Sequence, residues 1–363
     1  MKRLFALLVG INNYLIPRPL KGCLADSQEY EEFLRGRVDR RTHELHLRKL
    51  LDEEATRAAI MEGFREHLAL AGPDDTALFV FCGHGSQQPS DPEDWKIEPD
   101  RMDQTLVCYD SRLCGSDLAD RDISRLLGGI AVRGAHVAVI LDACHSGSGT
   151  QDSAVSEARY APPRTDAGPA GYPVDSYAVR TGGSRWATAG AGHHVLLAAC
   201  RSDELAKEVV LRERHRGVFS ACLLEALKTC PGRITYKMLL ESTAAGVRRH
   251  VSRQHPQLEA SDAADLDVAC LGGAIGALPR QLSVDRDADH GWILNSGALH
   301  GVSVSSGAIR LVLFPRGTAP DEMRLPENAV GRAVVSQVLP AFSVVRLEFA
   351  AAPAAAGFDA LVE

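Results

Sequence analysis

The stretch Val-Ala-Val-Ile-Leu-Asp-Ala-Cys-His-Ser-Gly-Ser-Gly, residues 137–149, decides the fold class of this chain. Its first five residues form an unbroken apolar run with β-branched side chains, which predicts a strand buried on both faces of a sheet. The run stops at Asp142, and small and reactive residues follow, Cys144 among them. In open α/β sheets, ligands bind just beyond the carboxyl ends of parallel strands. We therefore expect an α/β fold with the Cys144 thiol at a functional edge of the sheet.

A second apolar run, residues 77–81, ends in the same way and continues into Cys82-Gly83-His84-Gly85. Two neighbouring parallel strands would bring the His84 imidazole to the same edge as the Cys144 thiol, and a nearby imidazole activates a cysteine as a nucleophile. The amides of Gly85 and Cys144 could form an oxyanion hole. Alone, a His or Cys at a strand end is more often structural. The matched pair favours catalysis.

Residues 81–85, Phe-Cys-Gly-His-Gly, together with residues 142–147, Asp-Ala-Cys-His-Ser-Gly, resemble the motifs of caspase-like cysteine peptidases. The likeness is greatest to the metacaspase and bacterial orthocaspase-type branch. The animal-caspase signature has Gln before Ala-Cys and its His about 50 residues upstream, whereas here Asp142 holds that place and the spacing is 144 − 84 = 60. The resemblance covers roughly residues 3–270. It implies an α/β/α sandwich around a mostly parallel sheet, with Cys144 and His84 as a catalytic dyad.

The composition is compatible with this interpretation. The chain has 363 residues, of which 45% are hydrophobic, so one large or two medium domains can bury a core. Its net charge of −7 gives no indication of nucleic acid or an anionic membrane as partner. The nine cysteines show neither a zinc-site spacing nor a disulfide framework. A thiol nucleophile needs a reducing compartment, which favours the cytoplasm. The apolar residues 4–9 are interpreted as a first strand rather than a secretory signal, since no small-residue cleavage site follows.

The pocket for the substrate residue before the cleaved bond is expected to be acidic. Asp26 lies in the first turn of a helix expected over residues 23–37, where a carboxylate would stabilise any helix. The resemblance implies that Asp26 and Asp142 line this pocket, with Cys82 in place of the family's serine. Two carboxylates facing one pocket repel each other unless a cation lies between them, and guanidinium fits carboxylates in a bidentate manner. We therefore expect cleavage after Arg, with Lys as the second choice.

A polar, acidic segment covers residues 86–112, and metacaspases have a comparable segment at which many bind calcium. Its spacing is only partly that of the family, and it contains no EF-hand loop. Solvated acidic loops are the commoner explanation of such runs. The metal therefore stays unknown, with calcium as an open cofactor. The candidate ligands are Asp100, Asp103, Asp120 and Asp122.

Residues 149–192 are rich in Gly, Pro, Ser, Ala and Asp and show no periodicity, which predicts a long exposed linker. In the caspase family this position joins the large and small subunits, here residues 1–148 and 193–277, and many members cut themselves there. A tether that is never cut is the alternative. Exposed loops are where proteolysis concentrates. The candidate autocleavage sites are Arg159, Arg164, Arg180 and Arg185.

From about residue 278 the pattern changes to β-branched runs separated by Gly, Pro and Asn. We expect residues 278–363 to form a small all-β module for packing, substrate docking or partner binding. Asp285 and Asp287 are spaced like loop residues, and residues 358–363 resemble a strand. The chain could be a fragment of a longer protein, and its oligomeric state does not follow from the sequence.

Together these features predict a cysteine endopeptidase that attacks with Cys144, transfers protons through His84 and cleaves protein or peptide substrates after basic residues. Bacterial relatives of this kind often act in stress, cell-death or antiviral defence, where a partner protein activates the peptidase, so the resemblance implies such regulation. One alternative is a catalytically silent caspase-like scaffold that binds partners. Another keeps the thiol for esterase or transpeptidase chemistry, against which the paired pocket acids argue.

Overall fold

The computed structural model describes residues 1–90, 101–113, 115–144, 157–164, 194–230, 234–276, 282–298, 302, 309–319, 322–348 and 357–363. The chain divides into two compact units, Met1–Gly276 and Ala277–Glu363, one residue before the boundary expected from the sequence. Each unit has a hydrophobic core of its own.

The first unit is built on a six-stranded sheet in the order β12-β9-β7-β3-β1-β2. All neighbouring strands are parallel except β12, which runs antiparallel to β9. The two central apolar runs form β3 and β7, and their residues are buried on both faces, as expected for strands covered by helices on each side. The strands are β1 (Lys2–Gly10), β2 (His43–Leu51), β3 (Thr76–Cys82), β7 (His136–Asp142), β9 (His194–Ala198) and β12 (Gln257–Ala260).

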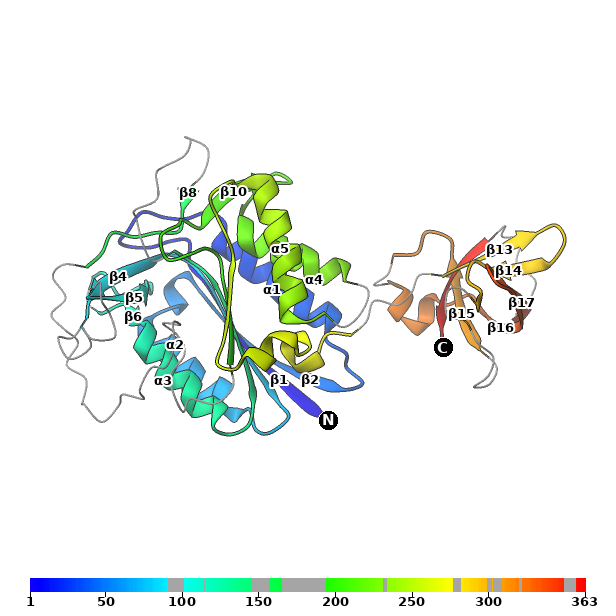
Figure 1. Cartoon of the computed structure of the whole chain (residues 1–363), viewed down its shortest axis with the longest axis horizontal. Coiled ribbons are helices and arrows are strands. Elements are labelled where there is room, and N and C mark those ends of the chain that lie inside the picture. The colour runs from blue at the N-terminus through cyan, green and yellow to red at the C-terminus, as the bar shows by residue number, and fades with distance from the viewer. Residues whose placement is uncertain are drawn as a thin grey trace. The chain divides into compact units, whose positions relative to one another are not determined.

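Helices cover both faces of this sheet, with α1, α4 and α5 on one side and α2 and α3 on the other (Figure 1). The first unit therefore has the expected α/β/α architecture, with helices on both faces of a mostly parallel sheet (Figure 1). None of the helices in the described ranges is long and apolar enough to span a membrane. The helices are α1 (Cys23–Arg37), α2 (Arg57–Glu62), α3 (Asp120–Ala131), α4 (Val218–Thr229) and α5 (Tyr236–His250).

The sequence pattern also predicts an amphipathic helix over residues 56–70 and a helix over residues 118–127, and the structure corrects both. The regular helix expected over residues 56–70 ends at Glu62, and a wider π turn and a 3₁₀ turn complete the segment. Gly63 begins the π turn and packs closely on the sheet, since a Cβ there would lie 2.7 Å from the Leu7 side chain. The helix expected over residues 118–127 begins at Asp120, because Leu118–Ala119 pair with a neighbouring strand instead.

Two small antiparallel sheets lie beyond the central one. The first has the order β4-β5-β6 and the second the order β11-β10-β8. Strand β4 follows directly after the His84 loop, and β8 belongs to the segment expected to be an exposed linker. The strands are β4 (Gly85–Pro89), β5 (Met102–Leu106), β6 (Leu118–Ala119), β8 (Glu157–Ala158), β10 (Lys207–Leu211) and β11 (Arg214–Gly217).

The second unit is a closed antiparallel barrel in the order β13-β14-β17-β16-β15-β18. Alternating residues of its strands form a small core around Val284, Leu311 and Phe358. The prediction that Asp285 and Asp287 lie in a loop is wrong, because both are in β13, where polar residues alternate with the buried ones. The strands are β13 (Leu282–Asp287), β14 (Gly291–Leu294), β15 (Arg310–Pro315), β16 (Gly331–Val338), β17 (Ser343–Glu348) and β18 (Gly357–Val362).

Candidate active site

The two strand ends that were expected to supply the chemistry lie side by side. Strands β3 and β7 pair in parallel with Cys82 opposite Asp142, and the Gly83 amide donates to the Asp142 carbonyl at 3.3 Å. His84 and Cys144 each follow two residues after this pair, and both are fully buried. The structure therefore brings the imidazole and the thiol to the same edge of the sheet.

His84 is held through both its backbone and its ring. Its amide donates to the Tyr14 hydroxyl at 2.9 Å, and its Nε2 lies 2.9 Å from the Arg18 carbonyl oxygen. Because a carbonyl oxygen only accepts, Nε2 carries the proton of the neutral ring. Nδ1 has no hydrogen-bond partner among the described residues and keeps its lone pair for a proton. Burial lowers the pKa of His84 from 6.5 to about 4, so the ring is neutral at pH 7.

The Cys144 thiol is also uncharged in this structure. Its Sγ lies 3.9 Å from the Ala206 carbonyl oxygen, and burial raises the pKa of the thiol from 9.0 to about 12. The closed site thus holds a neutral thiol and a neutral imidazole rather than a preformed ion pair. In such a site the sulfur becomes nucleophilic as its proton moves to the histidine.

Residues 157–164 run through this site, so the prediction that the whole of residues 149–192 is exposed is wrong for the described part. The Arg159 amide donates to the Ala206 carbonyl at 2.9 Å. The Arg159 carbonyl oxygen accepts hydrogen bonds from the Gly85 amide at 3.0 Å and the Cys144 amide at 3.1 Å. These are the two amides expected to form the oxyanion hole, and they hold the carbonyl of the peptide bond between Arg159 and Tyr160.

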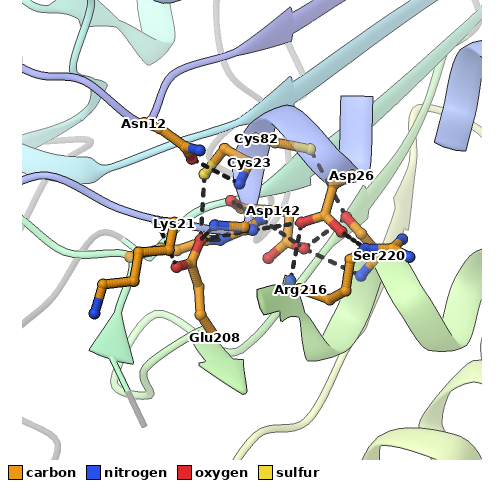
Figure 2. Close-up of polar contacts among 12 residues, drawn as sticks. Asn12, Lys21, Cys23, Asp26, Cys82, Asp142, Glu208, Arg216 and Ser220 are labelled. Atoms are coloured by element: carbon orange, nitrogen blue, oxygen red, sulfur yellow. Dashed lines mark hydrogen bonds and ion pairs between the residues drawn. The ribbon is translucent and has the colours of Figure 1, made fainter. Parts of the chain in front are cut away.

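The side chain of Arg159 is fully buried among three carboxylates. Its Nη1 lies 2.8 Å from Asp142 Oδ2 and its Nη2 forms an ion pair with Asp26 Oδ2. Glu208 Oε1 accepts from Nη2 at 2.9 Å and from Nε at 3.2 Å. Each of the three guanidinium nitrogens therefore meets at least one carboxylate. Figure 2 shows how Asp26 on α1, Asp142 at the end of β7 and Glu208 on β10 converge on one point.

Backbone amides and hydroxyls hold these acids in place. Asp142 Oδ2 accepts from the amide of Ser220 at 3.1 Å and from its hydroxyl at 2.6 Å. Glu208 accepts from the amides of Lys21 and Gly22, both at 3.0 Å. Such bonds fix the direction of each carboxylate before any side chain enters the pocket (Figure 2).

Asp26 is oriented by the start of α4 and by a second arginine. The Gly217 amide donates to Asp26 Oδ2 at 2.9 Å, and Arg216 Nε donates to Asp26 Oδ1 at 2.5 Å. A Cβ on Gly217 would lie 2.3 Å from Asp142 Oδ2 and 2.6 Å from Arg159 Nη1. Only a residue without a side chain leaves room here for the guanidinium.

Burial and the nearby charges shift the pKa values of Asp142 and Glu208 in opposite directions. Burial raises the pKa of Asp142, although the Arg159 charge and the Ser220 hydrogen bonds act against it. Burial also acts to raise the pKa of Glu208, but the Arg159 charge and the hydrogen bonds from Lys21 and Gly22 outweigh it and leave the pKa lowered. Three carboxylates face two arginines, Arg159 and Arg216, so the pocket is built for a cation.

The remaining predicted residues fall in different places. Cys82 lies next to Ser220, with its Sγ 3.8 Å from the Ser220 Oγ that donates to Asp142. Arg164 is away from the dyad, since its Nη1 donates to the Ser111 carbonyl at 3.1 Å. Arg180 and Arg185 lie outside the described residues.

The acidic segment shows ion pairs with arginines. Asp103 pairs with Arg121, and Asp122 pairs with Arg57 at 2.8 Å. Asp120 accepts from the Arg121 amide at 2.8 Å, whereas Asp100 is outside the described residues. Within the described ranges, no group of three or more His, Cys, Asp or Glu side chains is placed to hold a metal.

Sequence reasoning missed three residues of the pocket, Glu208, Arg216 and Ser220. Ser220 lies in Gly217-Val218-Phe219-Ser220, whose resemblance to a family segment was a signal that could have identified it. Glu208 lies ten residues after the end of β9 at Ala198 and has no local sequence pattern of its own. It reaches Arg159 because β10 lies beside β8 in a small antiparallel sheet.

Comparison with known proteins finds similarity to metacaspases over part of this chain. Residues 4–152 match the family model described as metacaspase, peptidase C14 domain. Metacaspase-1B of Aspergillus fumigatus is 30% identical over 149 residues, which are 39% of this chain and 35% of that protein. Metacaspase-1 of Eremothecium gossypii is also 30% identical over 149 residues, 39% of this chain and 32% of that protein. The match thus spans about a third of the length of these relatives.

One solved structure shows the same fold over a larger part of the chain. Protein GSU0716 from Geobacter sulfurreducens aligns with a TM-score of 0.53 and 20% identity, and the alignment covers 74% of this chain and 98% of that one. At this identity the likeness concerns the fold alone. It supports the arrangement of sheet and helices described above.

Proposed function

We propose that this chain, whose residues 4–152 match the model of the metacaspase peptidase C14 domain, is a cysteine endopeptidase that cleaves after arginine. One observation carries the proposal. The Arg159 carbonyl accepts from the Gly85 and Cys144 amides while its guanidinium is surrounded by Asp26, Asp142 and Glu208. A peptide bond after arginine therefore already lies where attack by Cys144 would occur.

The chemistry follows from this placement. Cys144 Sγ attacks the carbonyl carbon of the arginine, and the thiol proton passes to His84 Nδ1. The negative charge on the oxygen is stabilised by the Gly85 and Cys144 amides. His84 then protonates the leaving amine as the C–N bond breaks, which leaves a thioester on Cys144. Water, deprotonated by His84, hydrolyses the thioester and restores the thiol.

The pocket favours Arg over Lys. Asp26, Asp142 and Glu208 together contact all three guanidinium nitrogens of Arg159. Nε is one of these nitrogens and donates to Glu208. A lysine side chain has a single ammonium and nothing in place of Nε, so it cannot satisfy all three acids at once. A substrate with aspartate before the cleaved bond would add a fourth negative charge.

Self-processing and regulation belong to the same proposal. Of the four candidate arginines, Arg159 is the one whose carbonyl lies on the two amides, so we assign self-cleavage to the bond between Arg159 and Tyr160. Until that segment leaves, it excludes other substrates from the pocket. Release by an activating partner in a defence or stress pathway would fit such a closed state. The eight described cysteines are free thiols, in accord with the cytoplasm as the proposed location.

The test is release of a fluorophore from short peptides that end in Arg, Lys or Asp, with and without calcium. Wild-type protein should cleave after Arg, and Cys144→Ala should not. Mass spectrometry of the wild-type chain should find new termini at Arg159 and Tyr160. Cleavage after Asp would contradict the pocket assignment. An intact chain and uncut peptides in every condition would favour the alternative, a silent scaffold whose pocket is permanently filled by its own segment.

A further inference from the structure

The segment continues past the dyad along a second surface, which the proposed function does not use. After Arg159 it follows the free edge of β4, whose other edge pairs with β5. The Ala161 amide donates to the Gly85 carbonyl at 2.9 Å, and the Arg164 amide donates to the Gln87 carbonyl at 2.9 Å. The intervening residues 162 and 163 are prolines and have no amide. The described amides of residues 161–164 thus all bond to β4.

Side chains complete this surface. The Ser86 hydroxyl is fully buried and lies 3.0 Å from the Ala161 carbonyl oxygen and 2.9 Å from that of Pro162. Arg112 Nη1 donates to the Pro162 carbonyl at 3.1 Å. Arg112 is itself positioned by the buried Asp117, 2.7 Å from its Nη2. Both donors therefore point at backbone carbonyls of the bound segment.

Asp117 is fixed in turn by two hydroxyls. Ser111 Oγ donates to Asp117 Oδ1 at 2.7 Å, and Thr105 Oγ1 donates to Asp117 Oδ2 at 3.1 Å. Its carboxylate is fully buried, so the ion pair with Arg112 is shielded from water on one side. A positioned, largely buried arginine loses little freedom on binding, which makes it an effective anchor for a peptide carbonyl.

The end of the surface takes a basic side chain. Arg164 Nη1 donates to the Ser111 carbonyl at 3.1 Å and to the Gly115 carbonyl at 2.5 Å. Two converging carbonyl oxygens are a suitable acceptor site for a cationic side chain. Arg164, which occupies this site, is the fifth residue after the bond between Arg159 and Tyr160.

We propose that the free edge of β4 with Ser86 and Arg112, here called the β4 groove, is a substrate-binding site for the five residues after the cleaved bond. It binds an extended peptide by β-strand addition and selects a basic residue at the fifth position. This inference rests on the proposed function, because its first test measures peptide cleavage. It extends recognition from one arginine to a second one five residues later.

Internally quenched peptides test the proposal. Each begins with Glu-Ala-Arg and continues with Tyr-Ala-Pro-Pro-Arg, Tyr-Ala-Pro-Pro-Ala or Tyr-Ala. Because the chain's own segment competes equally with all of them, the ratio of kcat/KM between two peptides is independent of that competition. We expect the full peptide to be cleaved about tenfold faster than the Ala-ended peptide, since one charged hydrogen-bond donor is lost. A ratio near one would overturn the basic subsite.

Arg112→Ala tests the groove from the protein side. It should lower the ratio between the full and the shortest peptide about tenfold. The matched control is Arg40→Ala, an exposed arginine just before β2, at the opposite end of the sheet. That variant should leave the ratio unchanged. An equal ratio in Arg112→Ala and Arg40→Ala would refute the groove even though cleavage after Arg persists.

A second measurement needs no catalysis. In the Cys144→Ala chain, which cannot cut itself, hydrogen exchange of the Ala161 and Arg164 amides reports how firmly the segment is held. Adding Arg112→Ala should speed exchange at both amides about tenfold, while amides of β7 report any global loss of stability. Unchanged exchange at residues 160–164 would overturn the proposal. Faster exchange together with uncut peptides would place the failure in the proposed function and not in the groove.

Discussion

If the chain has the proposed function, replacement of Glu208 by glutamine should reduce its preference for Arg over Lys. Glutamine has nearly the same shape and keeps one oxygen as acceptor, but it removes the negative charge. In the structure, Glu208 Oε1 accepts from both Nε and Nη2 of the bound arginine. The Gly22 amide can keep the remaining oxygen as its acceptor, whereas the Lys21 amide, which donates to the other carboxylate oxygen, loses its acceptor.

The magnitude follows from these two contacts. A hydrogen bond to a charged partner contributes about 1.5–3 kcal/mol and a neutral one about 0.5–1.5 kcal/mol, so loss of the carboxylate charge costs about 1.5 kcal/mol for an arginine substrate. That is about tenfold in kcat/KM. A lysine substrate lacks the second nitrogen that Glu208 contacts, and its kcat/KM should fall by no more than about threefold.

The assay compares two peptides that differ only in Arg or Lys before the cleaved bond. The chain's own Arg159 is also held less firmly in the variant, which would raise the cleavage of both peptides together. The Arg-to-Lys ratio of kcat/KM is therefore the quantity to measure, and we expect it to fall by a factor of about three to ten. Glu225→Gln, an exposed position on α4, is the matched control. An Arg-to-Lys ratio equal to that of this control would refute the role of Glu208.

Four further outcomes are expected. Arg159→Ala should abolish cleavage before Tyr160 and raise cleavage of added Arg peptides at least about tenfold, because a tethered competitor is lost; an unchanged rate would show that the segment does not block the site. Cys144→Ala should lower kcat/KM by a factor of at least about 10⁴ and leave the melting temperature within a few degrees; residual cleavage would require another nucleophile. His84 has its pKa lowered to about 4 in the folded chain. As the pH is lowered, the single-turnover rate of self-cleavage should therefore fall with a midpoint near pH 4. The free energy of unfolding should also decrease as the pH falls from about 6.5 towards 4, because His84 binds a proton more readily in the unfolded chain. Urea titrations that show no such decrease relative to His84→Gln would contradict this. Gly217→Ala should reduce cleavage after Arg at least about tenfold, since its Cβ would lie 2.3 Å from Asp142 Oδ2, and an unaffected kcat/KM would show that the pocket is wider than described.

Much of the fold and the centre of the site could be predicted because the signals are local. Continuous apolar runs indicate strands buried on both faces, and reactive residues directly after two such runs indicate one shared edge. His84 and Cys144 needed nothing more than this pattern. Asp26 and Asp142 needed the family resemblance as well, because a carboxylate in a first helical turn has an ordinary explanation.

The rest depended on tertiary packing that no local pattern records. Glu208 belongs to β10, where its neighbours Lys207 and Val209 give no sign that it faces a pocket. The linker composition predicted exposure, yet an extended segment can be buried wherever strand edges and an acidic pocket accept it, as Arg159 shows. The end of α2 at Glu62 likewise reflects the close approach of Gly63 to Leu7 and not helix propensity.

The placement of residues 157–164 between two strand edges would limit which proteins the proposed peptidase could cut. Glu157–Ala158 add a strand to β10, and the residues after Arg159 bond to β4. A fully extended run of this length is about 26 Å long, at about 3.3 Å per residue. Helical segments already use their own amides and carbonyls internally and cannot offer them to these edges. An arginine in a helix or a compact loop should therefore survive, and selection among proteins would rest on local unfolding as much as on sequence.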